Sequence, residues 1–91
     1  MGDALREQAE IRNAKGLHAR AAAKFCKTVE RFEAEVRVAR NGTEVLGTSI
    51  MGLMMLAAGR GSMIEITVTG TDAAEAMAAV RKLIANKFDE E

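Results

Sequence analysis

The chain has 91 residues, of which 48% are hydrophobic and 29% charged, and its 13 basic and 13 acidic side chains leave no net charge. This composition indicates one globular domain over residues 1–91 and excludes a disordered chain. The charge balance and the small number of aromatic side chains argue against a nucleic-acid or anionic-membrane partner. One cysteine allows no internal disulfide, and no stretch is apolar for long enough to cross a membrane, so we expect a cytoplasmic protein.

The N-terminal third predicts a strand followed by a helix. We interpret residues 4–12 as a strand because the segment is short and a glycine turn follows at Lys15-Gly16. From Ala19 to Phe32 apolar side chains recur at helical spacing, which predicts an amphipathic helix. Its apolar side contains Cys26, which we expect in the core, and its charged side contains Lys24 and Lys27, which we expect in solvent.

A hairpin is expected next. Residues 34–40 alternate apolar and charged side chains, which predicts a half-buried strand, and residues 43–48 return as its partner. Asn41-Gly42 between them suits a type I′ turn, in which both central residues have positive φ.

The remaining elements are a short helix, a strand and a final helix. The segment after Ser49 predicts a short helix that ends at Gly59 or Gly61. Residues 62–70 show the clearest alternation of the chain and predict a strand. Asp72 and Glu75 have the spacing of a capping box, in which Asp72 begins the last helix and Glu75 reaches back to its amide. The element order is typical of an α+β fold with helices on one face of an antiparallel sheet.

His18, the one histidine of the chain, stands where the glycine turn enters the first helix. The amides of a first helical turn have no partner inside the helix, and together with the positive helix end they form a site for an anion. Arg20 adds a planar cation that can hold phosphate oxygens. These parts suit an imidazole that accepts a phosphoryl group, and they are equally compatible with a histidine that only titrates. Since one histidine and a distant cysteine do not supply a zinc site, we expect neither metal nor cofactor.

Two segments point to a known family. GLHARAAAKF (residues 16–25) resembles the active-site signature of the HPr family, the small phosphocarriers of the bacterial phosphotransferase system. TSIMGLMMLAAGRGSMIEI (residues 48–66) is similar to the region of that family that runs from its regulatory serine into the last strand. The similarity extends from about residue 4 to residue 86. It implies an HPr-like open-faced β-sandwich, with a four-stranded antiparallel sheet covered on one face by three helices.

The resemblance also implies a mechanism, that of a monomeric carrier which is not itself an enzyme. Enzyme I, phosphorylated from phosphoenolpyruvate, would pass its phosphoryl group to Nδ1 of His18 with the assistance of Arg20. The phosphohistidine would then donate to a histidine of an EIIA-type protein. In one departure from the family pattern, Ala21 stands where the family usually has proline, which leaves a weaker or divergent carrier open.

The short helix combines a cap with an apolar surface. Ser49 is a preferred N-cap residue, and the resemblance implies that it is also a regulatory serine phosphorylated by an HPr kinase. One short helix on a sheet cannot bury both of its sides, so we expect a core side and an exposed docking side. The expected core side is Leu53 and Leu56, and the expected docking side is Ile50, Met51 and Met54. By resemblance, Lys27 would help to meet an acidic partner surface.

Two other classes of protein compete with the carrier as interpretations of the sequence. A ferredoxin-like binding or regulatory module shares the alternation of helices and strands, but it predicts a longer second helix and gives no role to His18 and Arg20. A self-sufficient enzyme is disfavoured because the sequence has no nucleotide-binding loop, metal cluster or catalytic pair. Within the family, MMLAAG and GRGS look more like carriers of the nitrogen-regulation branch than like those of sugar transport.

Overall fold

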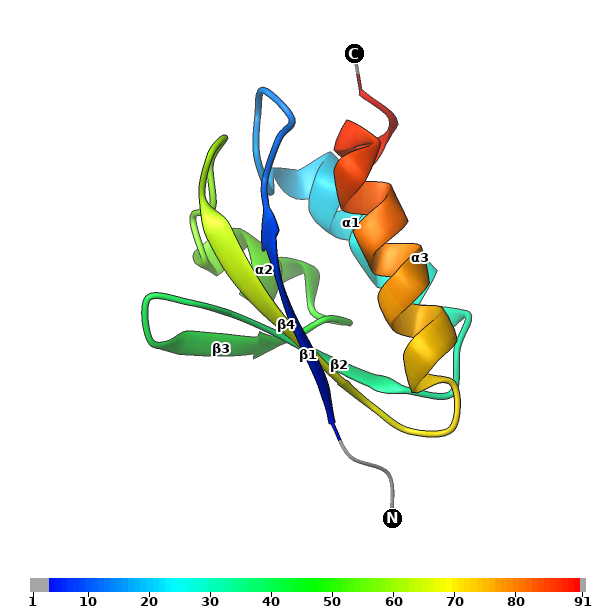
Figure 1. Cartoon of the computed structure of the whole chain (residues 1–91). Helices are drawn as coiled ribbons and strands as arrows, with labels where there is room; N and C mark the ends of the chain where they lie inside the picture. The colour runs from blue at the N-terminus through cyan, green and yellow to red at the C-terminus, as the bar shows by residue number, and fades with distance from the viewer. Residues whose placement is uncertain (1–3, 91) are drawn as a thin grey trace.

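The computed structural model describes residues 4–90, in which helices lie on one side of a twisted sheet (Figure 1). The strands are β1 (Leu5–Glu10), β2 (Glu35–Arg40), β3 (Thr43–Leu46) and β4 (Met63–Thr69). The helices are α1 (Ala19–Glu30), α2 (Ile50–Met55) and α3 (Ala73–Ala85), and a 3-10 turn, η1 (Lys87–Asp89), follows α3. The predicted α+β fold and element order are confirmed, and η1 has no counterpart among the expected elements.

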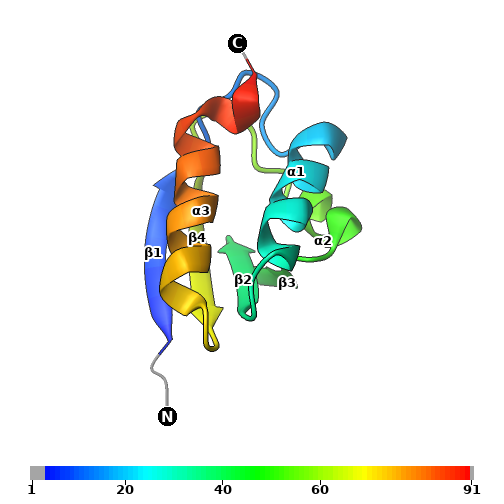
Figure 2. The same ribbon diagram turned by 90° about the vertical axis from the view of Figure 1, so that its right-hand side faces the viewer.

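The sheet has the strand order β1-β4-β2-β3, and every neighbouring pair is antiparallel. The alternation read from the sequence places Val36 and Val38 of β2, and Ile64, Ile66 and Val68 of β4, on the buried face. Figure 2 shows α1 and α3 side by side over this face. The opposite face is polar and open, and it contains the ion pairs of Arg37 with Glu35 and Glu44.

The β2–β3 hairpin closes as expected. Asn41 has φ 52° and Gly42 has φ 83°, the two positive values that a type I′ turn requires. Arg40 and Thr43 are the last pair before the turn.

The core lies between the sheet and the helices. Phe25 is fully buried at its centre, and Cys26 beside it is 4% exposed, so the expected core position of the cysteine is confirmed. Burial raises the pKa of the Cys26 thiol, and the charge of Glu30 raises it further. Leu53 and Leu56 are buried, which confirms the expected core side of α2.

The start of α3 differs from the predicted capping box. Asp72 occupies the N-cap position, but its side chain makes no capping hydrogen bond. Instead its Oδ2 accepts from the backbone N–H of Glu33 at 2.7 Å, and the Asp72 N–H donates to the Glu33 carbonyl at 3.0 Å. The local spacing was misleading because the acceptor serves the connection between α1 and β2, which lies nearby only in the folded chain.

Candidate functional site

The loop before α1 is packed tightly against the segment that follows α2. Gly16 has φ +66°, and a Cβ at this position would lie 2.4 Å from the Ala58 carbonyl oxygen and 2.7 Å from Gly59 Cα. The next amide, that of Leu17, donates to the same Ala58 oxygen at 2.9 Å. Gly16 is therefore required both for the turn and for the close approach, and it fixes where the chain enters α1.

His18 is the N-cap residue of α1, but its side chain does not cap the helix. Its backbone is extended (φ −77°, ψ 178°), its carbonyl accepts from Ala22 N–H at 2.8 Å, and its ring makes no hydrogen bond to the first turn. The N–H groups of residues 19–21 consequently have no partner inside the helix. The His18 side chain is 27% exposed, and Arg20 in the same turn is exposed. The expected combination of imidazole, cation and free amides is thus present at one helix end.

Glu90, which the sequence analysis did not single out, contacts His18. One carboxylate oxygen, Oε2, is hydrogen-bonded to His18 Nε2, and the other, Oε1, accepts from Asn13 Nδ2 at 3.1 Å. The hydrogen bond to His18 is the main cause that lowers the pKa of the Glu90 carboxyl; partial burial opposes it, and the Asn13 bond and the charges of His18 and Lys15 add to the lowering. This carboxylate is 18% exposed.

The turn η1 delivers Glu90 to this position. Lys87, Phe88 and Asp89 all have positive φ, 57°, 56° and 62°, although none is glycine. Each left-handed residue destabilises the fold by about 1–2 kcal/mol, and burial of a phenylalanine side chain stabilises it by about 1.5–3 kcal/mol. Phe88 is fully buried, and its carbonyl accepts from Lys24 Nζ at 2.9 Å. The prediction that Lys24 only faces solvent is therefore wrong: its long side chain reaches the C-terminal turn.

Helix α2 begins with a closed cap. The Ser49 hydroxyl oxygen accepts from Gly52 N–H at 2.9 Å, which confirms the predicted N-cap. Beyond it, the helix presents apolar side chains to solvent, as expected, and the exposed fractions are 42% for Ile50, 71% for Met51, 40% for Met54 and 72% for Met55. The exposure of Met55 extends the expected docking side. Because α2 packs against α1 (Figure 2), this surface lies on the element next to the one that begins at His18.

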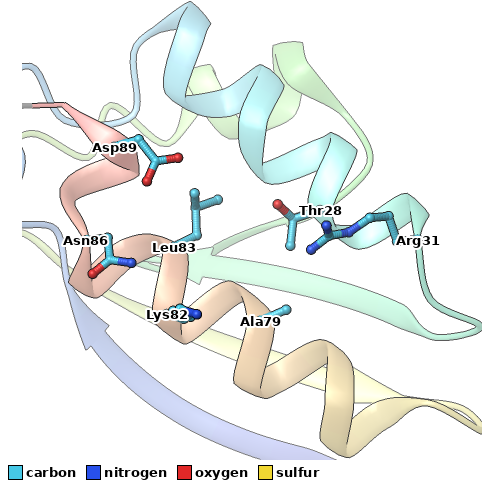
Figure 3. A pocket seen from close by; sticks show the side chains of 7 residues that line it. All are labelled: Thr28, Arg31, Ala79, Lys82, Leu83, Asn86 and Asp89. Atoms are coloured by element: carbon cyan, nitrogen blue, oxygen red, sulfur yellow. The ribbon is translucent and has the colours of Figure 1, made fainter.

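A shallow groove between α1 and α3 is separate from these features (Figure 3). It is lined by Thr28, Arg31, Ala79, Lys82, Leu83, Asn86 and Asp89. Neither His18 nor Ser49 lines this groove, so the groove is not part of the site. Over residues 4–90, no cluster of histidine, cysteine or acidic side chains could hold a metal ion, and no helix has the length and apolarity to cross a membrane.

Comparisons with known proteins agree with this arrangement. The family model described as "PTS HPr component phosphorylation site" matches residues 5–86. The chain belongs to the HPr family. The phosphocarrier protein HPr of Neisseria meningitidis is 51% identical over 86 residues, which are 94% of this chain and 97% of that protein. The HPr of Cupriavidus necator is 48% identical with the same coverage.

Solved HPr structures share the fold. A crystal structure of an HPr from Thermoanaerobacter tengcongensis superposes with a TM-score of 0.91 at 38% identity, and the match covers 96% of this chain and 98% of that one. A second structure from the same organism is described as an HPr dimer, with a TM-score of 0.76, 39% identity and coverage of 90% and 94%. The ferredoxin-like alternative is wrong, because α2 is short, residues Ile50–Met55, and the HPr fold is present. HPr proteins are phosphocarriers of the phosphotransferase system, so the carrier class expected from the sequence is confirmed.

Proposed function

We propose that this chain accepts a phosphoryl group on Nδ1 of His18 from phosphorylated enzyme I and donates it to a histidine of an EIIA-type protein. The observation that carries the proposal is the partly exposed His18 ring at a helix start without a side-chain cap, with Arg20 in the same turn. The chain would be a covalent intermediate between two enzymes of the system rather than an enzyme itself. It would meet them in turn as a monomer.

The chemistry at this helix start supports phosphoryl transfer. Charge on the transferred group is spread over its equatorial oxygens, and catalysis consists mainly of positioning and of stabilising that charge. The free amides of the first turn and the guanidinium of Arg20 are donors suited to those oxygens. The partners would supply the in-line geometry that the transfer requires.

Intact mass spectrometry tests the proposal directly. After incubation with enzyme I and phosphoenolpyruvate, the wild-type chain should gain one acid-labile phosphoryl group, and His18→Ala should gain none. Arg20→Ala should still be phosphorylated, but about tenfold more slowly or worse, because charge-assisted hydrogen bonds to the phosphoryl oxygens are lost. A wild-type chain that an active enzyme I leaves unmodified would refute the carrier role at His18.

The exposed surface of α2 is the proposed docking surface, formed by Ile50, Met51 and Met54. Methionine-rich apolar surfaces adapt to several partners, which a shuttle between unrelated proteins requires. Lys27, exposed on α1, would add a cation for an acidic partner surface. Met51→Glu should leave the fold intact and raise the KM of enzyme I for the carrier. The matched control is Met63→Glu, which changes a methionine that is 50% exposed on the open face of the sheet; equal kinetics in the two variants would argue against docking through α2.

Ser49 is the proposed regulatory site, modified by an HPr kinase. Its position beside Ile50 and Met51 supports this, because a phosphate there would place about −2 charges within the docking surface. Phosphorylation should then hinder association with enzyme I without unfolding the domain. Ser49→Asp should reproduce the effect and Ser49→Ala should not; an Asp variant that enzyme I phosphorylates at the wild-type rate would contradict this mechanism.

A further inference from the structure

The Glu90 carboxylate that contacts His18 is held in place by a second hydrogen bond. Both oxygens of the Glu90 carboxylate are used, one by the His18 ring and one by the Asn13 amide. Asn13 is 1% exposed, and its Nδ2 also donates to the Gly16 carbonyl at 2.8 Å. Since both neighbours of Nδ2 are acceptors, the amide orientation is fixed. Asn13 thereby connects the loop that enters α1 with the segment that follows α3.

The backbone also indicates that the placement of Glu90 is built into the fold. Three successive left-handed residues are unfavourable without glycine, and such strain persists only where the surroundings hold it. Here the buried Phe88 ring and the Lys24 hydrogen bond hold the turn from two sides. Glu90 follows directly, and its N–H donates to the Lys87 carbonyl at 2.9 Å. The backbone of Glu90 is therefore held in place, which fixes the position from which its side chain reaches His18.

The contact decides which ring nitrogen of His18 is protonated. An ionised carboxylate only accepts hydrogen bonds, so Nε2 must carry the hydrogen that faces Glu90. In a neutral imidazole the other nitrogen, Nδ1, then holds a free lone pair. The His18 ring makes no hydrogen bond to the first turn of α1, so the Nδ1 lone pair stays available for an incoming electrophile.

We propose that Glu90 is the positioning residue of His18: it holds the Nε2 proton, keeps Nδ1 as the nucleophile, and balances the positive charge of the phosphorylated ring. The first two parts concern the free protein, and the third rests on the proposed function. On acceptance, the Nδ1 lone pair forms the N–P bond while the bond from phosphorus to the donor's nitrogen breaks, and its electron pair stays on the donor. The ring becomes a phosphoimidazolium that retains its Nε2 proton beside the carboxylate. On donation the N–P electron pair returns to Nδ1, so no proton moves in either direction.

The single histidine makes the first test unambiguous, because every imidazole signal in a ¹⁵N-labelled sample comes from residue 18. At a pH where the ring is neutral, the wild-type chain should show the Nε2–H tautomer, and Glu90→Ala should show added Nδ1–H. Asp89→Asn is the matched control: it removes a carboxylate one residue away, 65% exposed, at a left-handed position that asparagine tolerates. Identical spectra for wild type and Glu90→Ala would overturn the positioning role.

The second test concerns the phosphorylated ring. The groups that act on Glu90 besides the ring are Asn13 and Lys15, from the loop before α1, and neither changes in the variants. Glu90→Gln lacks the charge, and its single amide oxygen can accept from His18 Nε2 but not also from Asn13 Nδ2. In this variant phosphohistidine should lose its Nε2 proton at a pH lower by about 0.5 unit. Donation to the acceptor above that pH should slow by about threefold. Asp89→Asn should match the wild type in both measurements, and equal midpoints in wild type and Glu90→Gln would refute the charge-balancing role.

The two proposals fail separately. If a competent enzyme I does not phosphorylate the wild-type chain, the carrier function at His18 is refuted, while the tautomer comparison in the free protein still decides whether Glu90 positions the ring. If the chain is phosphorylated but Glu90→Ala changes neither tautomer nor rate, the carrier function stands and the role of Glu90 is refuted.

Discussion

Helices α1 and α2 both begin at an extended residue whose carbonyl accepts the first helical hydrogen bond, but the two N-cap side chains do opposite things. Ser49 caps its own helix, since its hydroxyl accepts from Gly52 N–H at 2.9 Å. His18 leaves the first-turn amides of α1 without a side-chain cap and turns its ring to Glu90. One helix start is closed by its own chain, and the other is left open.

The same backbone geometry at a helix start can therefore serve either stability or chemistry. A side-chain cap contributes about 1 kcal/mol and occupies one of the first-turn donors, here the Gly52 N–H. An uncapped start gives up that stabilisation and keeps amide donors and a positive helix end for an anion. In this protein the uncapped start of α1 contains the proposed nucleophile, His18, and the capped start of α2 lies beside the proposed docking surface.

Replacing the N-cap histidine of α1 by serine, the N-cap residue of α2, should have the largest effect on phosphotransfer. His18→Ser should abolish phosphorylation completely, because the nucleophile is gone. Serine should also cap the first turn, so that this variant is more stable than His18→Ala by about 1 kcal/mol. Chemical denaturation of the two variants measures the difference. Equal stabilities would mean that the amides of the α1 start already have other partners.

The next effect tests the loop that orients the open start. Gly16→Ala should lower the free energy of unfolding by about 3 kcal/mol, because its Cβ would lie 2.4 Å from the Ala58 oxygen at a left-handed φ. Gly42→Ala is the control, since φ is +83° there but no atom lies within 4 Å of the new Cβ. It should cost only about 1 kcal/mol. Similar losses in thermal melts of both variants would show that the packing against Ala58 is unimportant.

Features that depend on near neighbours were predictable from the sequence. The alternation of Val36 and Val38, and of Ile64 and Ile66, reports directly which face of a strand is buried. The place of His18 at a helix start follows from Gly16 two residues before it and from the apolar spacing after it. The Ser49 cap likewise involves a donor only three residues away.

Features that depend on distant partners were not predictable. Glu90 is 72 residues from His18, and the acceptor role of Asp72 is toward Glu33, 39 residues away. No glycine marks the left-handed turn that brings Glu90 into place. The one signal that could have found it is Phe88, an apolar residue beyond the helix end, which must be buried somewhere.

A smaller effect concerns the closed start of α2. Ser49→Ala should lower stability by about 1 kcal/mol, because the hydroxyl caps the helix. It should leave phosphorylation of His18 at the wild-type rate, because the unmodified hydroxyl takes no part in the transfer. Ser49→Asn, which also caps well, should restore most of the stability. Urea titration and the mass assay measure the two properties separately. A loss of phosphotransfer in Ser49→Ala, at temperatures where it is folded, would mean that the two helix starts are less distinct than their geometry indicates.

The smallest expected effect is the pH dependence of the contact that occupies the His18 ring. The pKa of Glu90 is lower in the folded protein than its ordinary value, mainly through the hydrogen bond with His18, so folding favours the ionised carboxylate. Its stabilisation is fully present above the ordinary value of about 4.3 and is lost as the pH falls through the lower folded-state value. The wild-type chain should therefore exceed Glu90→Gln in stability by less than about 1 kcal/mol at pH 6, and the excess should vanish toward pH 3. Denaturation of both chains across this range cancels the titration of all other carboxylates, and an excess that stays constant with pH would show that ionised Glu90 does not stabilise the fold.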